Sequence, residues 1–213
     1  MNVSSELMLN HADVPSPQPT VLGVGGSPRR GGNSDILLQH IIDGVRGGGV
    51  AADRFYLREF RYGGCIGCER CRRDKICTGL KDGMSLLYPR ILASRGLVLV
   101  SPTHHYNVTA WMKAFIDRLY CFYDFEDSRP RGWSSRLAGQ GRKAVLAAVC
   151  EQVDEGDMGF TLEAMRRPVQ ALGYDIVGEL PVFGIFDKGG VKGKGEALTA
   201  AEELGIRLSQ SIS

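Results

Sequence analysis

Several features of other protein classes are missing from this sequence. Its 213 residues contain no apolar run of the roughly 18 residues that a membrane-spanning helix needs. The formal net charge is only +2, which is too small to indicate nucleic acid binding. Residues 1–20 have neither the basic start nor the apolar centre of a secretory signal. We therefore expect a cytoplasmic protein without a membrane or nucleic acid partner.

Residues 1–19 carry little that predicts regular structure. Pro15, Pro17 and Pro19 fall close together there, and such spacing is typical of an extended tail. The whole chain is 43% hydrophobic, which is ordinary for a globular protein of this length. We predict an N-terminal tail over residues 1–19 and one domain over residues 20–213, with a cysteine-rich insertion at about 58–83.

Short apolar runs alternate with segments of helical periodicity along this domain. Buried strands are predicted at residues 20–25, 50–57, 97–100, 144–150 and 174–183. Helices are predicted around residues 36–45, 84–91, 112–119, 162–172 and 198–208. Pro89 predicts that the second of these helices is kinked or begins late. Five strands that alternate with helices are typical of a parallel sheet covered on both faces.

A glycine-rich segment follows the first predicted strand. Residues 25–34 read Gly-Gly-Ser-Pro-Arg-Arg-Gly-Gly-Asn-Ser, and they offer backbone N–H groups, hydroxyls, an amide and a helix N-terminus. Ligands of parallel sheets bind at the carboxyl ends of strands, so the segment predicts a phosphate site. It is not a dinucleotide fingerprint, because Pro28 stands where the third glycine belongs, and no P-loop pattern occurs. The alternative is a glycine-rich turn without a ligand.

Four of the six cysteines crowd into one short segment. They are separated by two, two and five residues: Cys65, Cys68, Cys71 and Cys77. This local spacing indicates metal or redox chemistry in a reducing compartment, and it favours a 4Fe–4S cluster with all four ligands nearby. Zinc is the alternative metal, and free thiols or a disulfide are the alternatives without metal. Cys121 and Cys150 fall in a predicted helix and strand and are expected to be core thiols.

Three segments carry a family resemblance. They are residues 26–34, residues 100–107 (Val-Ser-Pro-Thr-His-His-Tyr-Asn) and residues 112–119 (Met-Lys-Ala-Phe-Ile-Asp-Arg-Leu). Together they resemble the NADPH-dependent FMN reductase family of flavodoxin-like proteins, and the cysteine pattern resembles the iron–sulfur flavoproteins within it. The resemblance covers roughly residues 20–210. It implies an α/β three-layer sandwich with a five-stranded parallel sheet of order 2-1-3-4-5, bound FMN, and a homodimer or homotetramer.

The resemblance also assigns residues to the cofactors. The FMN phosphate would be held by Ser27, Arg29, Asn33 and Ser34. The isoalloxazine would lie along Pro102, Thr103, His104, His105, Tyr106 and Asn107. The 4Fe–4S cluster would be held by Cys65, Cys68, Cys71 and Cys77. Tyr106 can pack on an aromatic ring, whereas the alternative for His104 and His105 is a polar pair on an exposed loop.

These assignments predict an FMN-dependent oxidoreductase that couples FMN to a 4Fe–4S cluster. The electron donor is predicted to be NAD(P)H or a reduced ferredoxin, and no catalytic side chain is identified. Five cationic residues lie near the cysteines in the sequence: Arg61, Arg70, Arg72, Arg73 and Lys75. They would stabilise the negative charge of a cluster and attract an acidic ferredoxin. The alternative is that they form an ordinary solvated loop. The alternatives are a cluster-free NAD(P)H-dependent FMN or quinone reductase, and a non-enzymatic flavin redox sensor.

Overall fold

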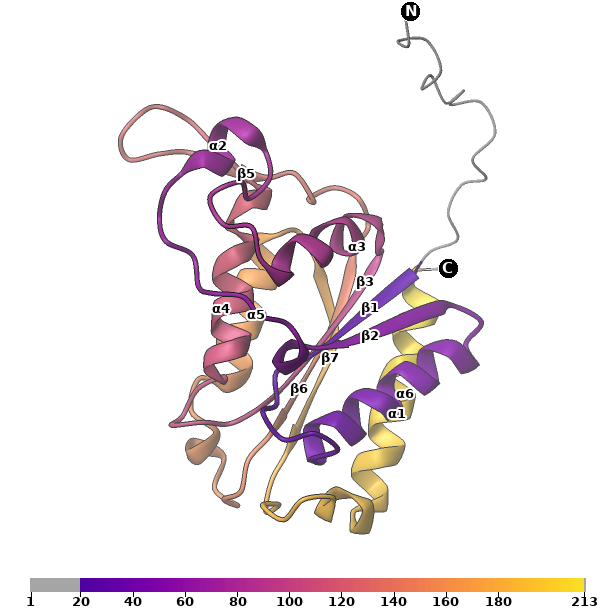
Figure 1. The fold of residues 1–213 in the computed structure, drawn as a ribbon. Helices are drawn as coiled ribbons and strands as arrows, with labels where there is room; N and C mark the ends of the chain where they lie inside the picture. The colour runs from indigo at the N-terminus through magenta and orange to yellow at the C-terminus, as the bar shows by residue number, and fades with distance from the viewer. Residues whose placement is uncertain (1–19, 213) are drawn as a thin grey trace, which may run out of the picture.

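The computed structural model describes residues 20–212, and the predicted tail over residues 1–19 lies outside the described part. A parallel five-stranded sheet runs through the centre of the molecule (Figure 1), in the order β2-β1-β3-β6-β7. Its strands are β1 (Thr20–Gly25), β2 (Ala51–Tyr56), β3 (Gly96–Pro102), β6 (Lys143–Val149) and β7 (Asp175–Val182). Numbered by their order along the chain, they give the predicted order 2-1-3-4-5, so the predicted flavodoxin-like topology is confirmed.

Helices cover both faces of the sheet (Figure 1). Helices α1 (Asn33–Gly47) and α6 (Gly195–Ile212) lie on one face. Helices α3 (Tyr88–Ala93), α4 (Ala110–Arg118) and α5 (Thr161–Ala171) lie on the other. Each helix turns an apolar stripe toward the sheet, and burying one such side chain contributes roughly 1.5–3 kcal/mol. Pro89 lies in the first turn of α3, so that helix begins late, as predicted.

A small hairpin lies outside the main sheet and was not predicted from the sequence. Strands β4 (Tyr123–Phe125) and β5 (Trp133–Ser135) pair in antiparallel fashion. Strands this short carry too few residues for a recognisable alternation. The inserted cysteine segment adds the short helix α2 (Arg70–Asp74), which lies beside the hairpin.

Short 3₁₀ turns complete the described chain. They are η1 (Leu57–Glu59), η2 (Gly83–Leu86), η3 (Leu119–Phe122), η4 (Glu155–Met158) and η5 (Gly190–Gly193). No helix within residues 20–212 is both long and apolar enough to cross a membrane.

Helix α4 separates the two regions that the sequence marks as functional. At its N-terminal end, Thr109 Oγ1 donates to Gly26 O at 2.7 Å, which joins the loops that follow β3 and β1. At its C-terminal end, Arg118 contacts the cysteine segment through Gly63. The helix has nine residues and is about 14 Å long. The predicted flavin residues and the cysteines therefore lie at opposite ends of α4.

Candidate functional site

The loop between β1 and α1 lies at the carboxyl edge of the sheet and has the features of an anion site. Helix α1 follows Gly32, and no side chain caps its N-terminus. The first N–H groups of a helix have no acceptor within the helix, and its dipole favours negative charge there. Ser27, Asn33 and Ser34 are all buried at this end. Backbone donors and buried hydroxyls in this arrangement suit a phosphate monoester.

Two of the predicted phosphate residues contact the chain after β7. Asn33 Nδ2 donates to Asp187 O at 3.0 Å, and its Oδ1 accepts from the N–H of Val191 at 3.2 Å. Arg29 Nη1 donates to Phe186 O at 3.1 Å, and its guanidinium lies 4.9 Å from the centre of the Phe186 ring. Both side chains thus anchor the loop to residues 186–191, a segment that the sequence did not mark as functional.

The ion pair of Arg58 with Asp35 also supports the loop between β1 and α1. Arg58 donates to both carboxylate oxygens of Asp35, at 2.9 and 2.8 Å, and also to Ser27 O at 3.1 Å. Asp35 Oδ2 accepts from the N–H of Gly31 at 2.7 Å. Charge-assisted, bidentate hydrogen bonds of this kind are strong and directional. The loop conformation is therefore held by two residues that sequence reasoning missed, of which Asp35 was visible as an acid in a helical first turn.

The loop between β3 and α4 contains a strained two-residue turn. The backbones of His104 and Asn107 pair with each other at 2.8 and 3.1 Å. The two residues between them have positive φ, +48° at His105 and +61° at Tyr106. Tight hairpin turns require this conformation, which usually calls for glycine or asparagine. Strained backbone at such residues is commonly found at ligand sites.

The chain that leads into α5, together with the first residue of that helix, holds this turn in place. Tyr106 O accepts from the N–H of Phe160 at 2.7 Å, and a Cβ at Gly159 would clash with the Tyr106 backbone. Thr161 Oγ1 donates to Thr103 Oγ1 at 3.0 Å. Tyr106 itself remains 58% exposed, so its ring is free to meet a ligand or a substrate.

The two loops converge on each other. Burial lowers the pKa of His104, and the positive charge of Arg29 and the neighbouring His105 lower it further. His104 is therefore a neutral imidazole at neutral pH, able to donate through one nitrogen and accept through the other. The charge of Arg29, a residue of the predicted phosphate set, thus acts on His104 of the predicted isoalloxazine set.

The four clustered cysteines line one cavity of about 260 Å³ at the other end of α4. All six cysteines of the chain are free thiols. Burial raises the pKa of Cys71, and the nearby thiols of Cys77, Cys65 and Cys68 raise it further. Gly79 closes one wall, where an added Cβ would clash with Cys68 Sγ. The structure therefore brings together the four thiols that the sequence placed in one set.

Four cysteines on one cavity supply the donor set that zinc and iron–sulfur clusters both take. A zinc ion needs four sulfurs at about 2.3 Å from one point, whereas an iron–sulfur cluster places its own iron and sulfide atoms between the thiolates. Among residues 20–212, no group of three or more His, Cys, Asp or Glu side chains is placed to hold a metal ion. The thiol chemistry of the cavity therefore fits either group.

Cys121 is a fifth thiol close to this segment. It lies in η3 and is buried. Burial raises its pKa to about 12, and Cys71 and Cys77 act in the same direction. The other remaining thiol, Cys150, is also buried, but its N–H bonds to Val182 O at the edge of the sheet. The predicted core location of both thiols is confirmed, although the proximity of Cys121 to the cysteine segment was not foreseen.

The cations around the cysteines are largely paired with acids. Arg72 contacts Glu69 and Asp127, Arg73 contacts Asp74, and Lys75 contacts Asp124. Asp124 and Asp127 belong to the β4–β5 hairpin and its loop. Ion pairs at exposed positions reduce the field that distant charges feel. The attraction expected for an acidic ferredoxin is therefore weaker than the sequence alone suggests.

Comparison with known proteins identifies the family. The family model for NADPH-dependent FMN reductase matches residues 19–154. The chain belongs to the NADPH-dependent FMN reductase family. An iron-sulfur flavoprotein from Archaeoglobus fulgidus is 27% identical over 191 residues, which cover 90% of this chain and 79% of that protein. The resemblance predicted from the sequence is confirmed for the family and for the likeness to iron–sulfur flavoproteins.

Solved structures agree on the fold. An NAD(P)H:quinone oxidoreductase from Methanothermobacter marburgensis superposes with a TM-score of 0.65 at 20% identity, covering 90% of this chain and 99% of that chain. A flavodoxin from the domain Archaea superposes with a TM-score of 0.52 at 12% identity, covering 91% and 98% of the two chains. At these identities the likeness establishes the flavodoxin-like fold of this family member.

Proposed function

We propose that this member of the FMN reductase family is an FMN-dependent electron-transfer oxidoreductase that couples FMN to a 4Fe–4S cluster. The observation that carries the proposal is the convergence of four free thiols on one cavity, within a chain of a flavin reductase family. A relative named as an iron-sulfur flavoprotein, similar over 90% of this chain, supports it. The cluster ligands would be Cys65, Cys68, Cys71 and Cys77.

FMN would bind across the two loops at the N-terminal end of α4. Ser27, Ser34 and the first N–H groups of α1 would bind its phosphate, since all three lie at an uncapped helix start. Arg29 and Asn33 would keep that loop in shape through their contacts with residues 186–191. Residues 102–107 would lie along the isoalloxazine, where Tyr106 offers an exposed ring and the neutral His104 offers a donor and an acceptor.

Bound together, the two groups would supply an exchange between the two-electron chemistry of a flavin and the single-electron chemistry of a cluster. The protein contributes the geometry. The strained turn at His105 and Tyr106 fixes the backbone beside the flavin site, and Gly79 leaves room for Cys68 at the cavity wall. The electron donor would be NAD(P)H or a reduced ferredoxin. The family resemblance further suggests a homodimer or homotetramer, and the clustered thiols suggest the reducing cytoplasm.

Anaerobic purification followed by cofactor analysis tests this proposal. We expect about one FMN, four irons and four acid-labile sulfides per chain, with broad absorbance beneath the flavin bands. Cys71→Ser should lose most of the iron and sulfide and keep its FMN. Cys150→Ser is the matched control, because Cys150 is a buried thiol that does not line the cavity, and it should keep both cofactors.

The alternative functions give different results in the same experiment. Full FMN without iron after anaerobic reconstitution with iron and sulfide would reject the cluster and leave a cluster-free FMN or quinone reductase. Absence of turnover with NAD(P)H or reduced ferredoxin, for any quinone or flavin acceptor, would reject the enzyme and favour a redox sensor. Equal iron loss in Cys71→Ser and Cys150→Ser would mean that general destabilisation, rather than ligation, releases the iron.

A further inference from the structure

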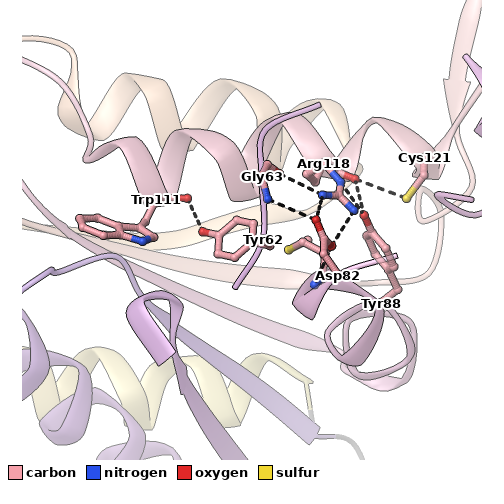
Figure 2. Close-up of polar contacts among 8 residues, drawn as sticks. Tyr62, Gly63, Asp82, Tyr88, Trp111, Arg118 and Cys121 are labelled. Carbon is pink, nitrogen blue, oxygen red and sulfur yellow. Dashed lines mark hydrogen bonds and ion pairs between the residues drawn. The ribbon is translucent and has the colours of Figure 1, made fainter. Parts of the chain in front are cut away.

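Arg118, the last residue of α4, is a buried arginine with several polar contacts (Figure 2). It is one of the residues that line the cysteine cavity. Only 2% of the residue is exposed. Its Nε donates to Tyr88 Oη at 3.1 Å, and its Nη1 donates to Gly63 O at 2.9 Å. Nη1 and Nη2 also donate to the two carboxylate oxygens of Asp82, at 2.7 and 3.0 Å. Both arms of the planar guanidinium are used, and a lysine ammonium cannot reproduce that geometry.

These contacts join the two ends of the cysteine segment. Gly63 comes two residues before Cys65, and Asp82 comes five residues after Cys77. The Asp82 carboxylate also accepts from the N–H of Gly63 at 3.2 Å. Gly63, Asp82 and Arg118 therefore form a neck through which the segment leaves the domain and returns to it. All four cysteines lie on the loop that this neck closes.

The neck is also attached to the rest of the fold. Asp82 accepts from the N–H of Met84, at the start of η2. Arg118 ends α4, which packs on the sheet. Just before the neck, Tyr62 Oη donates to Trp111 O at 2.6 Å, so the incoming chain is also attached to the first turn of α4 (Figure 2). Motion of the cysteine loop is thus limited at its base by rigid elements.

The neck contributes its arginine, and not its aspartate, to the lining of the cavity. Two charged residues of the described part line the cavity, Glu69 and Arg118, and Asp82 is not among the lining residues. Glu69 accepts hydrogen bonds from Arg72 and Arg131, so its charge is already paired outside the neck. A positive charge at this wall would stabilise the negative charge of four thiolates.

We propose that Arg118 is a positioning residue for the 4Fe–4S cluster. It closes the neck of the cysteine loop, which holds the four thiolates at the cavity, and it places a positive charge beside them. The proposal rests on the function proposed above, because it presumes that the cavity holds a cluster.

The first test is iron release from Arg118→Lys, using the full chain reconstituted anaerobically with iron, sulfide and FMN. Lysine keeps the charge but loses the two-armed contact with Asp82, so the neck opens more readily. We expect a chelator to remove iron at least ten times faster than from the wild type. The FMN content should be unchanged, because the flavin loops lie at the other end of α4.

Arg142→Lys is the matched control. Arg142 is another buried arginine, 4% exposed, whose guanidinium donates to the carbonyls of Ile91, Leu92 and Ser94. It does not line the cysteine cavity. Both variants should unfold at lower temperature than the wild type, but only Arg118→Lys should release iron faster. Equal release from the two variants would overturn the proposal.

The second test is the potential of the cluster in the double variant Arg118→Gln with Asp82→Asn. This variant removes the cation at the cavity wall and leaves no unpaired buried charge. At the midpoint potential of the wild type, the ratio of reduced to oxidised cluster, measured by electron paramagnetic resonance, should fall at least threefold, or about 28 mV for one electron. An unchanged potential, with wild-type iron release from Arg118→Lys, would overturn the proposal. A wild type that takes up no iron would instead overturn the proposed function.

Discussion

Asp82 shows how one carboxylate links charge to stability in this protein. Burial opposes its ionisation, but hydrogen bonds from Arg118 and from the N–H groups of Gly63 and Met84 outweigh burial and hold its pKa below the usual range. A carboxylate whose pKa is depressed on folding stabilises the folded state at pH values above its unfolded pKa, about 3.9. That stabilisation disappears as the pH falls through the lower pKa of the folded state.

We predict a pH-dependent effect of Asp82→Asn on the free energy of unfolding. At pH 6 the variant should be less stable than the wild type by about 3 kcal/mol, because Arg118 is left as a buried charge without its partner. The difference should narrow as the pH falls below about 4, where Asp82 becomes protonated first in the unfolded wild type and, at still lower pH, in the folded state. Urea unfolding between pH 3 and pH 6 measures this.

The exposed pair of Asp53 with Arg90 provides the control for this measurement. Asp53→Asn should change the free energy of unfolding little at any pH, since exposed ion pairs contribute little. A stability difference for Asp82→Asn that stays constant down to pH 3 would contradict the assignment of a depressed pKa.

At the scale of secondary structure, the N-terminus of α4 connects the two flavin loops. Thr109 is fully buried and caps the helix, since its Oγ1 accepts from the N–H of Met112 at 3.2 Å. The same hydroxyl donates to Gly26 O at 2.7 Å. One side chain thus fixes the start of a helix and the distance between the loops that follow β1 and β3.

Thr109→Val should therefore affect both stability and flavin binding. Valine has nearly the same shape but no hydroxyl, so we expect a loss of about 1–2 kcal/mol in the free energy of unfolding. We also expect FMN affinity, measured by flavin fluorescence titration, to fall about tenfold, equal to about 1.4 kcal/mol. Thr109→Ser keeps the hydroxyl and should therefore keep most of the wild-type stability and FMN affinity. Wild-type FMN affinity in Thr109→Val would show that the loops hold their spacing without this contact.

The hairpin β4–β5 has a comparable role at the other end of α4. Its acids pair with Arg72 and Lys75 of the cysteine segment, and Arg136 at its end donates to the backbone carbonyls of Lys75 and Cys121. A hairpin and a loop distant in the sequence therefore support each other. Each exposed pair contributes little on its own, so the support comes from the set of contacts.

At the scale of the whole molecule, the fold separates the two candidate cofactor sites. The flavin loops gather at the carboxyl edge of the parallel sheet, where such folds bind ligands. The cysteine segment leaves after β2, follows α4 and closes its neck at Arg118 (Figure 2). Rigid packing of α4 on the sheet keeps the two sites at a fixed separation within one chain.

We predict that residues 20–213 are sufficient for folding and cofactor binding. A chain that begins at residue 20 should keep the melting temperature of the full chain within about 2 °C, which corresponds to less than about 1 kcal/mol. It should also keep the same FMN and iron content after anaerobic purification. Loss of either cofactor in the shortened chain would show that residues 1–19 take part in a site.

The sequence by itself determined the features that depend on local patterns. Apolar runs and helical spacing located the five main strands and the helices between them, because strands and helices bury one face at a regular period. The glycine-rich loop and the cysteine spacing were equally visible, since their residues are neighbours along the chain. From these patterns came the fold, the family and the two candidate sites.

Only the tertiary structure decided which distant residues support those sites. Arg118 and Asp82 are 36 residues apart in the sequence, and Asn33 lies 154 residues from Asp187. No periodicity relates such positions, because their contacts follow from the order of the strands and the path of the loops between them. The same reason explains why Arg118 entered the sequence analysis only within residues 112–119, a segment of the family resemblance, while in the fold it closes the cysteine loop.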